Sequence, residues 1–447
     1  MKKIYLSLLA AFIQLSSYSQ SWSMQNVGFY TPGADAFQIS IVDASTAWAS
    51  AANGLVASYN NEVSRTTDGG STWQCSRITT MNSDYGIFSI AGVDANTAFV
   101  VATSRPAWGS IIYKTSDGGS SWASVDSGLI FSGATSGGVQ VHFWNATHGI
   151  LIGDPLNSKF EIYTTIDGGN TWNPVQANNN PNAQANEFTV PKAFEFKGSC
   201  IWFSTNNGRL FKSSDYGEHW SVINSTLGWS MISFLSDTLT GLAQNGSGTF
   251  SYELTTDGGA TWTPVNSSGP GYFMLRSIPG TNIFLSFSGP PNDPYDFGSS
   301  YSLDYGTTWI PIDTFGVGTT NGYGWMEFLD IHTGWACGIS QDSLTDGIYK
   351  WNPGMLGIHE KKAYSSINIY PNPVCSGNAT INFYSERNEE VTFTLTDITG
   401  KTIREHKQHC NTGANNIGFN LSDLSPGIYL LSVSSGTQIA NAKIVKE

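Results

Sequence analysis

Two glutamates stand at matching positions in a chain of repeated strands. Glu195 and Glu327 each precede the last apolar residue of a strand that we expect to be innermost in its repeat, and His142 holds that place in a third repeat. Polar residues at one register of otherwise apolar strands indicate a water-filled central channel. One carboxyl group with a raised pKa beside an ionised one is the acid/base pair of glycoside hydrolysis. A solvated channel wall is the alternative, because sequence does not fix the distance between the carboxylates.

An octapeptide that recurs six times organises these strands. It reads TTDGGSTW at Thr66–Trp73, and its aspartate returns every 42 to 50 residues. Asp followed by Gly makes a tight turn in which the carboxylate accepts nearby backbone N–H groups, and the Trp packs between repeats. The period matches four-stranded propeller blades. We therefore predict structural aspartates at Asp68, Asp117, Asp167, Asp215, Asp257 and Asp304.

A seventh unit keeps the strands but lacks the octapeptide. Phe328–Trp335 matches the strand, turn and strand that precede each octapeptide, and Gly347–Gly354 aligns with Ile111–Gly118. Residues 21–27 resemble the strands that follow octapeptides, so we expect them to supply the outer strand of blade seven. Such a closure removes open sheet edges. The sequence thus predicts an all-β chain with a seven-bladed β-propeller over residues 21–355.

Composition supports this fold and excludes several classes of partner. The 447 residues are 13% aromatic and only 12% charged, with 48 Gly, which argues against disorder and coiled coils. The formal net charge is −13, and residues 21–362 carry 13 Lys and Arg against 27 Asp and Glu. Affinity for phosphate backbones comes from Lys and Arg, so nucleic acid and anionic membrane surfaces are not expected partners.

The octapeptide resembles the Asp-box, or BNR repeat, of sialidases, sortilin-type receptors, xyloglucanases and the photosystem II stability and assembly factor family of seven-bladed propellers. The resemblance implies the propeller fold but no single function, because the box occurs in enzymes, receptors and assembly factors. Sialidases also carry a Phe/Tyr-Arg-Ile-Pro motif and three substrate-clamping arginines. Here Phe29–Pro32 contains no arginine, so sialidase activity is not expected.

In such a propeller the long connectors between blades lie on one face, which we call the loop face, and the octapeptides lie on the other. Ligand binding is expected on the loop face, since function concentrates in loops on a rigid scaffold. Arg65 and Arg209 are expected beside octapeptides, away from it, and either Leu275 or Arg276 holds the channel position in blade six. The long connectors include Ser104–Ser110, Asn178–Pro191, Gly289–Ser300 and Gly316–Gly324. Ligand-binding candidates, unless their rings pack the loops themselves, are Trp108, Trp229, Tyr272, Tyr295, Phe297, Tyr323 and Arg276.

The C-terminal part changes character after a linker at residues 356–366. INIYPNPV at Ile367–Val374, TLTDITGK at Thr394–Lys401 and LSDLSPGIYLLSV at Leu421–Val433 alternate strands with turn residues, which predicts a small β-sandwich. These phrases resemble the type A C-terminal sorting domain of the type IX secretion system, over residues 367–447. The resemblance implies a Gram-negative, Bacteroidetes-type host, the type IX machinery as partner, and an extracellular or outer-membrane-surface location. An adhesive or carbohydrate-binding sandwich is the alternative.

The N-terminus predicts a secretory signal peptide over residues 1–20, with Lys2 and Lys3 before an apolar run. That run is shorter than the roughly 20 residues that span a bilayer, so no transmembrane segment is expected in the mature chain. Among the five cysteines, Cys375 and Cys410 are the candidate disulfide, with isolated buried cysteines as the alternative. No motif indicates a cofactor, and no metal site is expected.

These observations favour a secreted or cell-surface propeller that acts as a non-catalytic binding or adhesion scaffold for a glycan or a protein. The alternative is an extracellular glycoside hydrolase that uses Glu195 and Glu327, so enzymatic activity stays open. A third possibility is an assembly factor for surface proteins, although its basic patch is hard to build from so few Lys and Arg.

Overall fold

The computed structural model describes residues 22–53, 60–104, 109–125, 130–131, 137–224, 230–245, 251–272, 274–287, 298–313, 322–339, 347–352, 362–363, 367–374, 377–385, 388–397, 401–435 and 438–447. The predicted signal peptide lies outside these residues. The chain divides into two compact units, residues 1–353 and 354–447. Every described element is a β-strand. None of the described residues forms a helix that is long and apolar enough to cross a membrane.

The first unit consists of seven four-stranded antiparallel sheets, numbered here as blades from β2 onward. Blade one holds β2 (Ala34–Ile41), β3 (Ala47–Asn53), β4 (Glu62–Thr66) and β5 (Gln74–Arg77). Blade two holds β6 (Tyr85–Gly92), β7 (Ala98–Ser104), β8 (Ser110–Thr115) and β9 (Ala123–Ser124). Blade three holds β10 (Gly138–Phe143), β11 (Gly149–Leu156), β12 (Lys159–Thr165) and β13 (Asn173–Pro174). Blade four holds β14 (Thr189–Lys197), β15 (Cys200–Thr205), β16 (Arg209–Ser213) and β17 (Ser221–Asn224).

The remaining blades repeat the same order of strands. Blade five holds β18 (Ser230–Phe234), β19 (Gly241–Asn245), β20 (Ser251–Thr255) and β21 (Thr263–Val265). Blade six holds β22 (Met274–Ser277), β23 (Phe284–Phe287), β24 (Ser299–Ser302) and β25 (Ile310–Asp313). Blade seven holds β26 (Gly322–Asp330), β27 (Thr333–Ile339), β28 (Ile348–Trp351) and, at its outer edge, β1 (Trp22–Gln25).

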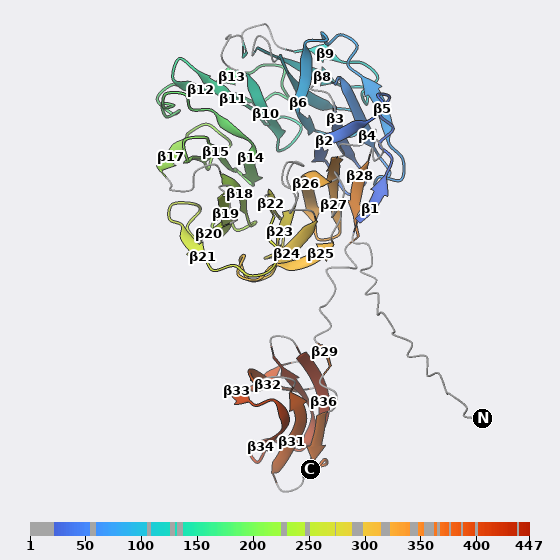
Figure 1. Ribbon diagram of the computed structural model, residues 1–447, viewed down its shortest axis with the longest axis vertical. Helices are drawn as coiled ribbons and strands as arrows, with labels where there is room; N and C mark the ends of the chain where they lie inside the picture. Colours follow the sequence, from blue (N-terminus) through green and yellow to red (C-terminus); the bar gives the residue numbers. More distant parts are fainter. Residues whose placement is uncertain are drawn as a thin grey trace, which may run out of the picture. The chain divides into compact units, whose positions relative to one another are not determined.

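The seven sheets follow one another around a ring, with the first strand of each nearest the axis (Figure 1). Apolar clusters join neighbouring blades; one of them packs Ile39 and Ala49 of blade one against Trp335 and Ile348 of blade seven. Burying large aromatic and aliphatic side chains between sheets is the main source of stability in such a ring. The predicted all-β propeller is confirmed, and the seven sheets fit seven blades.

The first strand of the described chain closes the ring. β1 pairs antiparallel with β28, with Trp22 opposite Trp351. The Trp22 ring is buried, with its centroid 4.8 Å from that of Trp351 and 5.6 Å from that of Tyr323. Its Nε1 donates to Oγ of Ser299 in blade six at 3.3 Å. The two ends of the propeller chain therefore share one sheet, and blade seven has its fourth strand only when both are present.

Each octapeptide folds into the same turn between the third and fourth strands. In the turn of Asp257, the Thr261 N–H donates to Oδ1 at 2.9 Å and the Thr261 hydroxyl to Oδ2 at 2.6 Å, while Thr255 Oγ1 donates to Oδ1 at 2.8 Å. The first glycine position has a positive φ, which Gly adopts freely. Tyr216 and Tyr305 occupy it in blades four and six with φ of 61° and 57°. The aspartate carboxylates are bound within their own turns. Their role is therefore structural: each stabilises the turn between the third and fourth strands of its blade.

Lysines three residues before the octapeptide aspartate, or before the matching position in blade seven, form a second repeated set of contacts, which the sequence patterns did not indicate. Lys114 donates to the carbonyl of Gly168 at 2.9 Å, Lys212 to that of Gly258 at 3.1 Å, and Lys350 to that of Gly69 at 2.6 Å. Each acceptor is an octapeptide glycine of the next blade. Each ammonium also lies over an aromatic ring of its own blade, which adds a cation–π contact. These residues link neighbouring sheets at the face opposite the loop face.

The second unit is a small β-sandwich, as predicted. One sheet has the order β29 (Lys362–Ala363), β36 (Gln438–Lys446), β35 (Gly427–Ser434), β32 (Glu389–Asp397) and β33 (Thr402–Cys410). The other has the order β30 (Ile367–Tyr370), β31 (Asn378–Ser385) and β34 (Gly413–Asn420). Phe393 and Val433 of the first sheet share a buried core with Ile381 and Phe419 of the second.

Candidate functional site

A cavity of about 370 Å³ lies on the propeller axis. Residues near the ends of the inner strands line it, together with Gly198, Ser236 and Pro279 from the turns that lead to the second strands. In a four-stranded meander these turns lie on the same side as the turns between third and fourth strands. The cavity therefore reaches toward the octapeptide side of the propeller.

Both glutamates singled out in the sequence line this cavity. Glu195 is 5% exposed, and its Oε1 receives the Lys197 ammonium at 2.9 Å. Its Oε2 is buried and has no hydrogen-bond partner among the described residues. Burial raises the pKa of Glu327 to about 7, against the opposing charge of Arg276. The structure thus brings the two candidates to one cavity in different electrostatic surroundings.

His142 and Arg276 also line the axial cavity. The His142 ring stacks on Phe196 with centroids 4.0 Å apart, and burial lowers its pKa to about 3, so the imidazole is neutral at physiological pH. Arg276, rather than Leu275, holds the channel position in blade six. Its Nε donates to the Met326 carbonyl at 3.1 Å, and its guanidinium lies 4.1 Å from the centroid of the Trp325 ring. Arg276 therefore belongs to the cavity wall.

The expected open channel narrows on the loop-face side of this cavity. A space of only about 20 Å³ follows, lined by Phe37, Gln38, Phe88, Val139, Gln140, Pro191, Lys192 and Trp325. The Phe37 and Phe88 rings meet edge to face with centroids 6.3 Å apart, and Nζ of Lys192 lies 4.6 Å from the Phe37 centroid. We call these eight residues the axial plug. The carboxylates of the axial cavity therefore lie behind it, as seen from the loop face.

β-Bulges produce the axial plug. The register of inner strands shifts at Phe37 in β2, at Phe88 in β6, at Val139 in β10 and between Thr189 and Phe194 in β14. A bulge adds one residue to a strand and redirects its side chain. Blade seven has the same one-residue shift at Gly324, whereas β14 carries three extra residues between Thr189 and Phe194. The irregularities of these five successive blades lie at one level of the ring, so side chains from different sheets meet on the axis.

A larger groove of about 810 Å³ opens on the loop face, beyond the axial plug. We call it the loop-face groove. Its walls come from the starts of inner strands, the turn between β11 and β12, and the connector from blade three to blade four. The lining residues are Phe88, Thr103, Gly137, Gly138, Val139, Asp154, Pro155, Ser158, Ala183, Gln184, Ala185, Asn186, Glu187, Phe188, Thr189 and Pro191. Its size is that of small-ligand and side-chain pockets in proteins.

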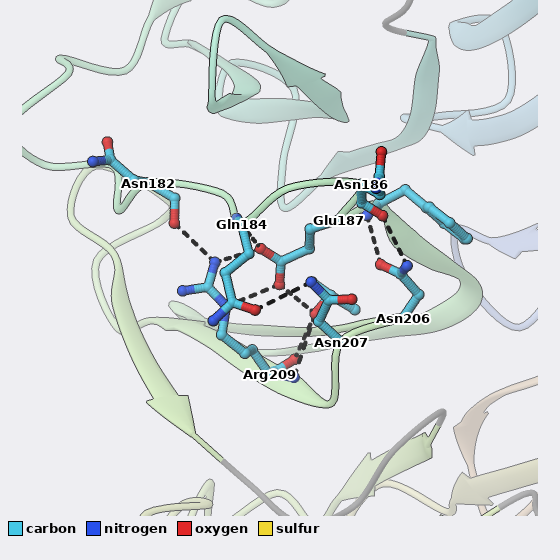
Figure 2. Close-up of polar contacts among 9 residues, drawn as sticks. Asn182, Gln184, Asn186, Glu187, Asn206, Asn207 and Arg209 are labelled. Atoms are coloured by element: carbon cyan, nitrogen blue, oxygen red, sulfur yellow. Dashed lines mark hydrogen bonds and ion pairs between the residues drawn. The ribbon is translucent and has the colours of Figure 1, made fainter.

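A polar network holds the connector that forms one wall of the groove (Figure 2). Arg209 donates from Nε to Oε1 of Glu187 at 2.9 Å and pairs through Nη2 with Oε2. The Thr205 hydroxyl donates to the same carboxylate at 2.6 Å, and the Gln184 N–H at 2.7 Å. Burial alone would raise the pKa of Glu187, but these bonds outweigh it and hold the pKa below its usual range. The connector is thus fixed by an ionised, fully bonded carboxylate.

Asparagines secure the same connector where Phe188 enters the groove. The Phe188 N–H donates to Oδ1 of Asn206 at 2.7 Å, and Nδ2 of Asn206 donates to the Asn186 carbonyl at 2.9 Å (Figure 2). Asn186 has a positive φ of 58°. Phe188 remains 38% exposed. An exposed aromatic ring is therefore presented by a backbone that β15 and β16 hold in place.

Asp154 lies opposite this connector, at the end of β11. Its Oδ1 accepts the Thr189 N–H at 3.0 Å and the Thr189 hydroxyl at 2.9 Å. Burial raises the pKa of Asp154 above its usual range, because these two bonds do not offset the loss of solvent. The groove therefore contains a carboxylate without a basic partner in its lining.

Several predicted binding residues are placed differently from expectation. Tyr272 and Tyr323 are only 6% and 1% exposed, so their rings pack in the core and cannot stack on a ligand. Arg209 was expected away from the loop face; that was wrong, because it sits at the start of β16, at the opposite end from the octapeptide. Trp108, Trp229, Tyr295 and Phe297 lie outside the described residues.

The predicted disulfide and the absence of a metal site stay predictions. Cys410 is buried in the sandwich core, whereas Cys375 lies outside the described residues. Among the residues that the structure describes, no three His, Cys, Asp or Glu side chains gather where they could hold a metal ion.

The sequence indicates the connector Asn178–Pro191 as a binding element but does not single out the residues that form the groove wall within it. Glu187 and Phe188 carry no motif, and Asp154 lies outside every connector that was considered. An acidic residue in a connector and an arginine on the following hairpin only weakly indicate an ion pair. The contact between Glu187 and Arg209 became evident only in the folded chain.

Comparison with known proteins assigns the C-terminal unit. Residues 368–447 match the family model of the secretion system C-terminal sorting domain. The C-terminal unit is a type IX sorting domain. This sorting domain implies handling by the type IX secretion system and export to the cell surface or extracellular space. No curated protein matches the chain in sequence.

Solved structures resemble the propeller at low sequence identity. YCF48 bound to D1 peptide aligns with a TM-score of 0.52 and 16% identity over 74% of this chain and 97% of that one. YCF48 from Cyanidioschyzon merolae aligns with a TM-score of 0.54 and 16% identity over 74% and 99% of the two chains. PorZ, a type IX surface component of Porphyromonas gingivalis, aligns with a TM-score of 0.35 and 11% identity over 95% and 75%. At these identities the likeness to YCF48 shows the fold alone.

Proposed function

We propose that this protein is a secreted, non-catalytic binding propeller whose ligand, a glycan or a protein, docks in the loop-face groove. The observation that carries the proposal is a groove of about 810 Å³ with one wall fixed by the Glu187–Arg209 pair. A site whose walls are held in place before binding loses little conformational entropy when the ligand arrives. The exposed Phe188 ring supplies an apolar contact surface within that frame.

The fold-level likeness is compatible with this proposal. One of the similar structures is YCF48 bound to D1 peptide, so a propeller of this architecture can hold a polypeptide ligand. The likeness does not transfer the residues of that site, because the sequences are only 16% identical. The residues proposed to bind a ligand in this chain are therefore those of its own groove.

The sorting domain sets where the binding would take place. We expect the protein on the outer membrane surface or outside a Gram-negative, Bacteroidetes-type cell, after cleavage of the signal peptide over residues 1–20. Deleting residues 363–447 should retain the propeller in the periplasm, which cell fractionation would measure. Normal export of the shortened chain would contradict this part of the proposal.

The binding function is tested by presenting the secreted full-length chain to a glycan array and to a displayed random-peptide library. Phe188→Ala should weaken any ligand that docks in the loop-face groove by about tenfold, because aromatic anchors dominate such contacts. Ile166→Ala is the matched control, since Ile166 is also an exposed apolar residue but belongs to an octapeptide. If the two substitutions changed ligand affinity equally, the proposal that the ligand docks in the loop-face groove would be wrong.

Glycoside hydrolysis in the axial cavity is the second candidate, favoured by the raised pKa of Glu327 in a cavity that Glu195 also lines. Glu327 would act as the general acid, and Glu195, whose Oε1 lies 2.9 Å from Nζ of Lys197, as the second carboxyl group of the pair. A substrate would have to enter from the octapeptide side, because the axial plug narrows the other approach. Release of reducing ends from a polysaccharide, lost in Glu327→Gln and Glu195→Gln with the fold intact, would establish an enzyme.

A further inference from the structure

The loop-face groove has a one-sided distribution of charge. Asp154 and Glu187 are its titratable residues, and its lining contains no Lys, Arg or His. Arg209 already neutralises Glu187 from outside the groove. Asp154 is thus the one carboxylate of the lining whose charge no described cation balances at hydrogen-bond distance.

The hydrogen bonds of Asp154 leave one side of the carboxylate available. Both donors from Thr189 bind Oδ1. No hydrogen bond to Oδ2 is present within the described part of the chain, and the side chain lines the groove. A partly buried carboxylate without a compensating charge is costly, and a cation at hydrogen-bond distance offsets part of that cost. Burial raises the pKa of Asp154, which is the direction expected when the ionised form of the carboxyl group is the costly one.

The groove walls suit the rest of a basic side chain. Phe88, Val139, Pro155, Phe188 and Pro191 supply apolar surface to the groove that Asp154 lines. Lys and Arg bury their methylene stems against such surface while the charged end reaches a polar partner. The surroundings have the complementary sign, because residues 21–362 carry 13 basic against 27 acidic side chains. That excess favours encounters with basic partners and disfavours anionic ligands.

We infer that the loop-face groove takes a lysine or arginine side chain of a protein partner, with the cation on Oδ2 of Asp154 and the stem against Phe188. This inference rests on the proposed function and specifies its ligand as a basic polypeptide segment. It excludes acidic glycans and acidic peptides, which would bring a second negative charge to an unbalanced carboxylate.

The test uses the secreted full-length chain and a displayed library of random dodecapeptides, selected at low salt. Selected peptides should be enriched in Lys or Arg. Synthetic versions are then compared with versions in which one basic residue is replaced by Nε-acetyl-lysine. With the parent protein, replacing the residue that enters the groove should weaken binding about tenfold or more, as for other buried charge pairs. With Asp154→Asn, the two peptides should bind equally.

Asn at position 154 keeps an oxygen to accept the two Thr189 donors, so the groove wall is preserved. Asp84→Asn is the control for net charge, because Asp84 is an exposed carboxylate in the connector between β5 and β6 and does not line the groove. It should leave the preference for a basic residue unchanged.

Three results would overturn the inference. Selection could give no basic peptides, acetylation could leave affinity unchanged, or Asp84→Asn could act as strongly as Asp154→Asn. Phe188→Ala distinguishes a wrong inference about the cationic ligand from a wrong proposal that the groove binds a ligand at all. If neutral peptides or neutral oligosaccharides bind and Phe188→Ala weakens them while Asp154→Asn does not, the groove remains the binding site but its ligand is not cationic.

Discussion

Arg209 donates from Nε to Oε1 of Glu187 at 2.9 Å and, through Nη2, pairs with the other oxygen of the same carboxylate. The pair joins the start of β16 to the connector that enters β14. The Glu187 side chain is fully buried, and that of Arg209 is 11% exposed. The contact thus fixes one wall of the loop-face groove through a hairpin of the same blade.

Replacing Arg209 by Met should both destabilise the protein and loosen the groove. The substitution leaves a buried carboxylate without its cation, which typically costs about 3–5 kcal/mol. Chemical denaturation measures the free energy of unfolding, and ligand binding should weaken in parallel. The double substitution Glu187→Gln with Arg209→Met should cost less than the sum of the single ones, because the residues interact directly. Additive effects would show that the pair does not hold the connector.

Replacing Glu327 by Gln should change how stability depends on pH. The pKa of Glu327 is about 7 in the folded protein, above its ordinary 4.5. The folded state therefore binds more protons, and this contribution to stability is lost as pH rises from about 4.5 to about 7. Glutamine is neutral at every pH, so Glu327→Gln should raise the melting temperature over the parent more at pH 8 than at pH 5. An equal difference at both pH values would contradict a buried, neutral carboxyl group.

The octapeptide turns should make the propeller sensitive to acid. The Thr261 hydroxyl and N–H lower the pKa of Asp257 from 3.8 to about 2. Since the folded pKa is the lower one, the stabilisation is present above about pH 4 and is lost as pH falls toward about 2. Asp257→Asn should therefore lower the melting temperature at pH 7, and the gap to the parent should close near pH 2. A gap that stays constant with pH would mean that the ionised carboxylate does not stabilise the turn.

Removing the Trp22 ring should open blade seven. The ring is buried against Trp351, so Trp22→Ala is expected to lower the free energy of unfolding by about 3–5 kcal/mol. Met24→Ala is the matched control on the same strand, because Met24 is 55% exposed. It should change the free energy of unfolding by less than about 1 kcal/mol. Equal effects would indicate that β1 contributes only through its backbone pairing.

Particular residues show why some features were predictable. Asp257 and its neighbours form a turn from bonds within eight consecutive residues, so the pattern alone predicts it. Glu195 and Glu327 occupy corresponding places in repeats, which placed both on the axis. The axial plug was missed because β-bulges interrupt the alternation of inner strands at Phe37 and Phe88. The rings of Tyr272 and Tyr323 were assigned to the surface because sequence gives no measure of burial between blades.

The sequence by itself determined the repeated blades, the C-terminal sandwich and its type IX address, because each is encoded by short-range or repeated patterns. Only the tertiary structure decided where a ligand could bind. The loop-face groove brings together residues from blades two, three and four, and its charge balance depends on which carboxylate meets a cation. Glu187 meets Arg209, whereas no cation meets Asp154 among the groove residues. Such pairings arise from contacts between residues distant along the chain, and no local pattern records them.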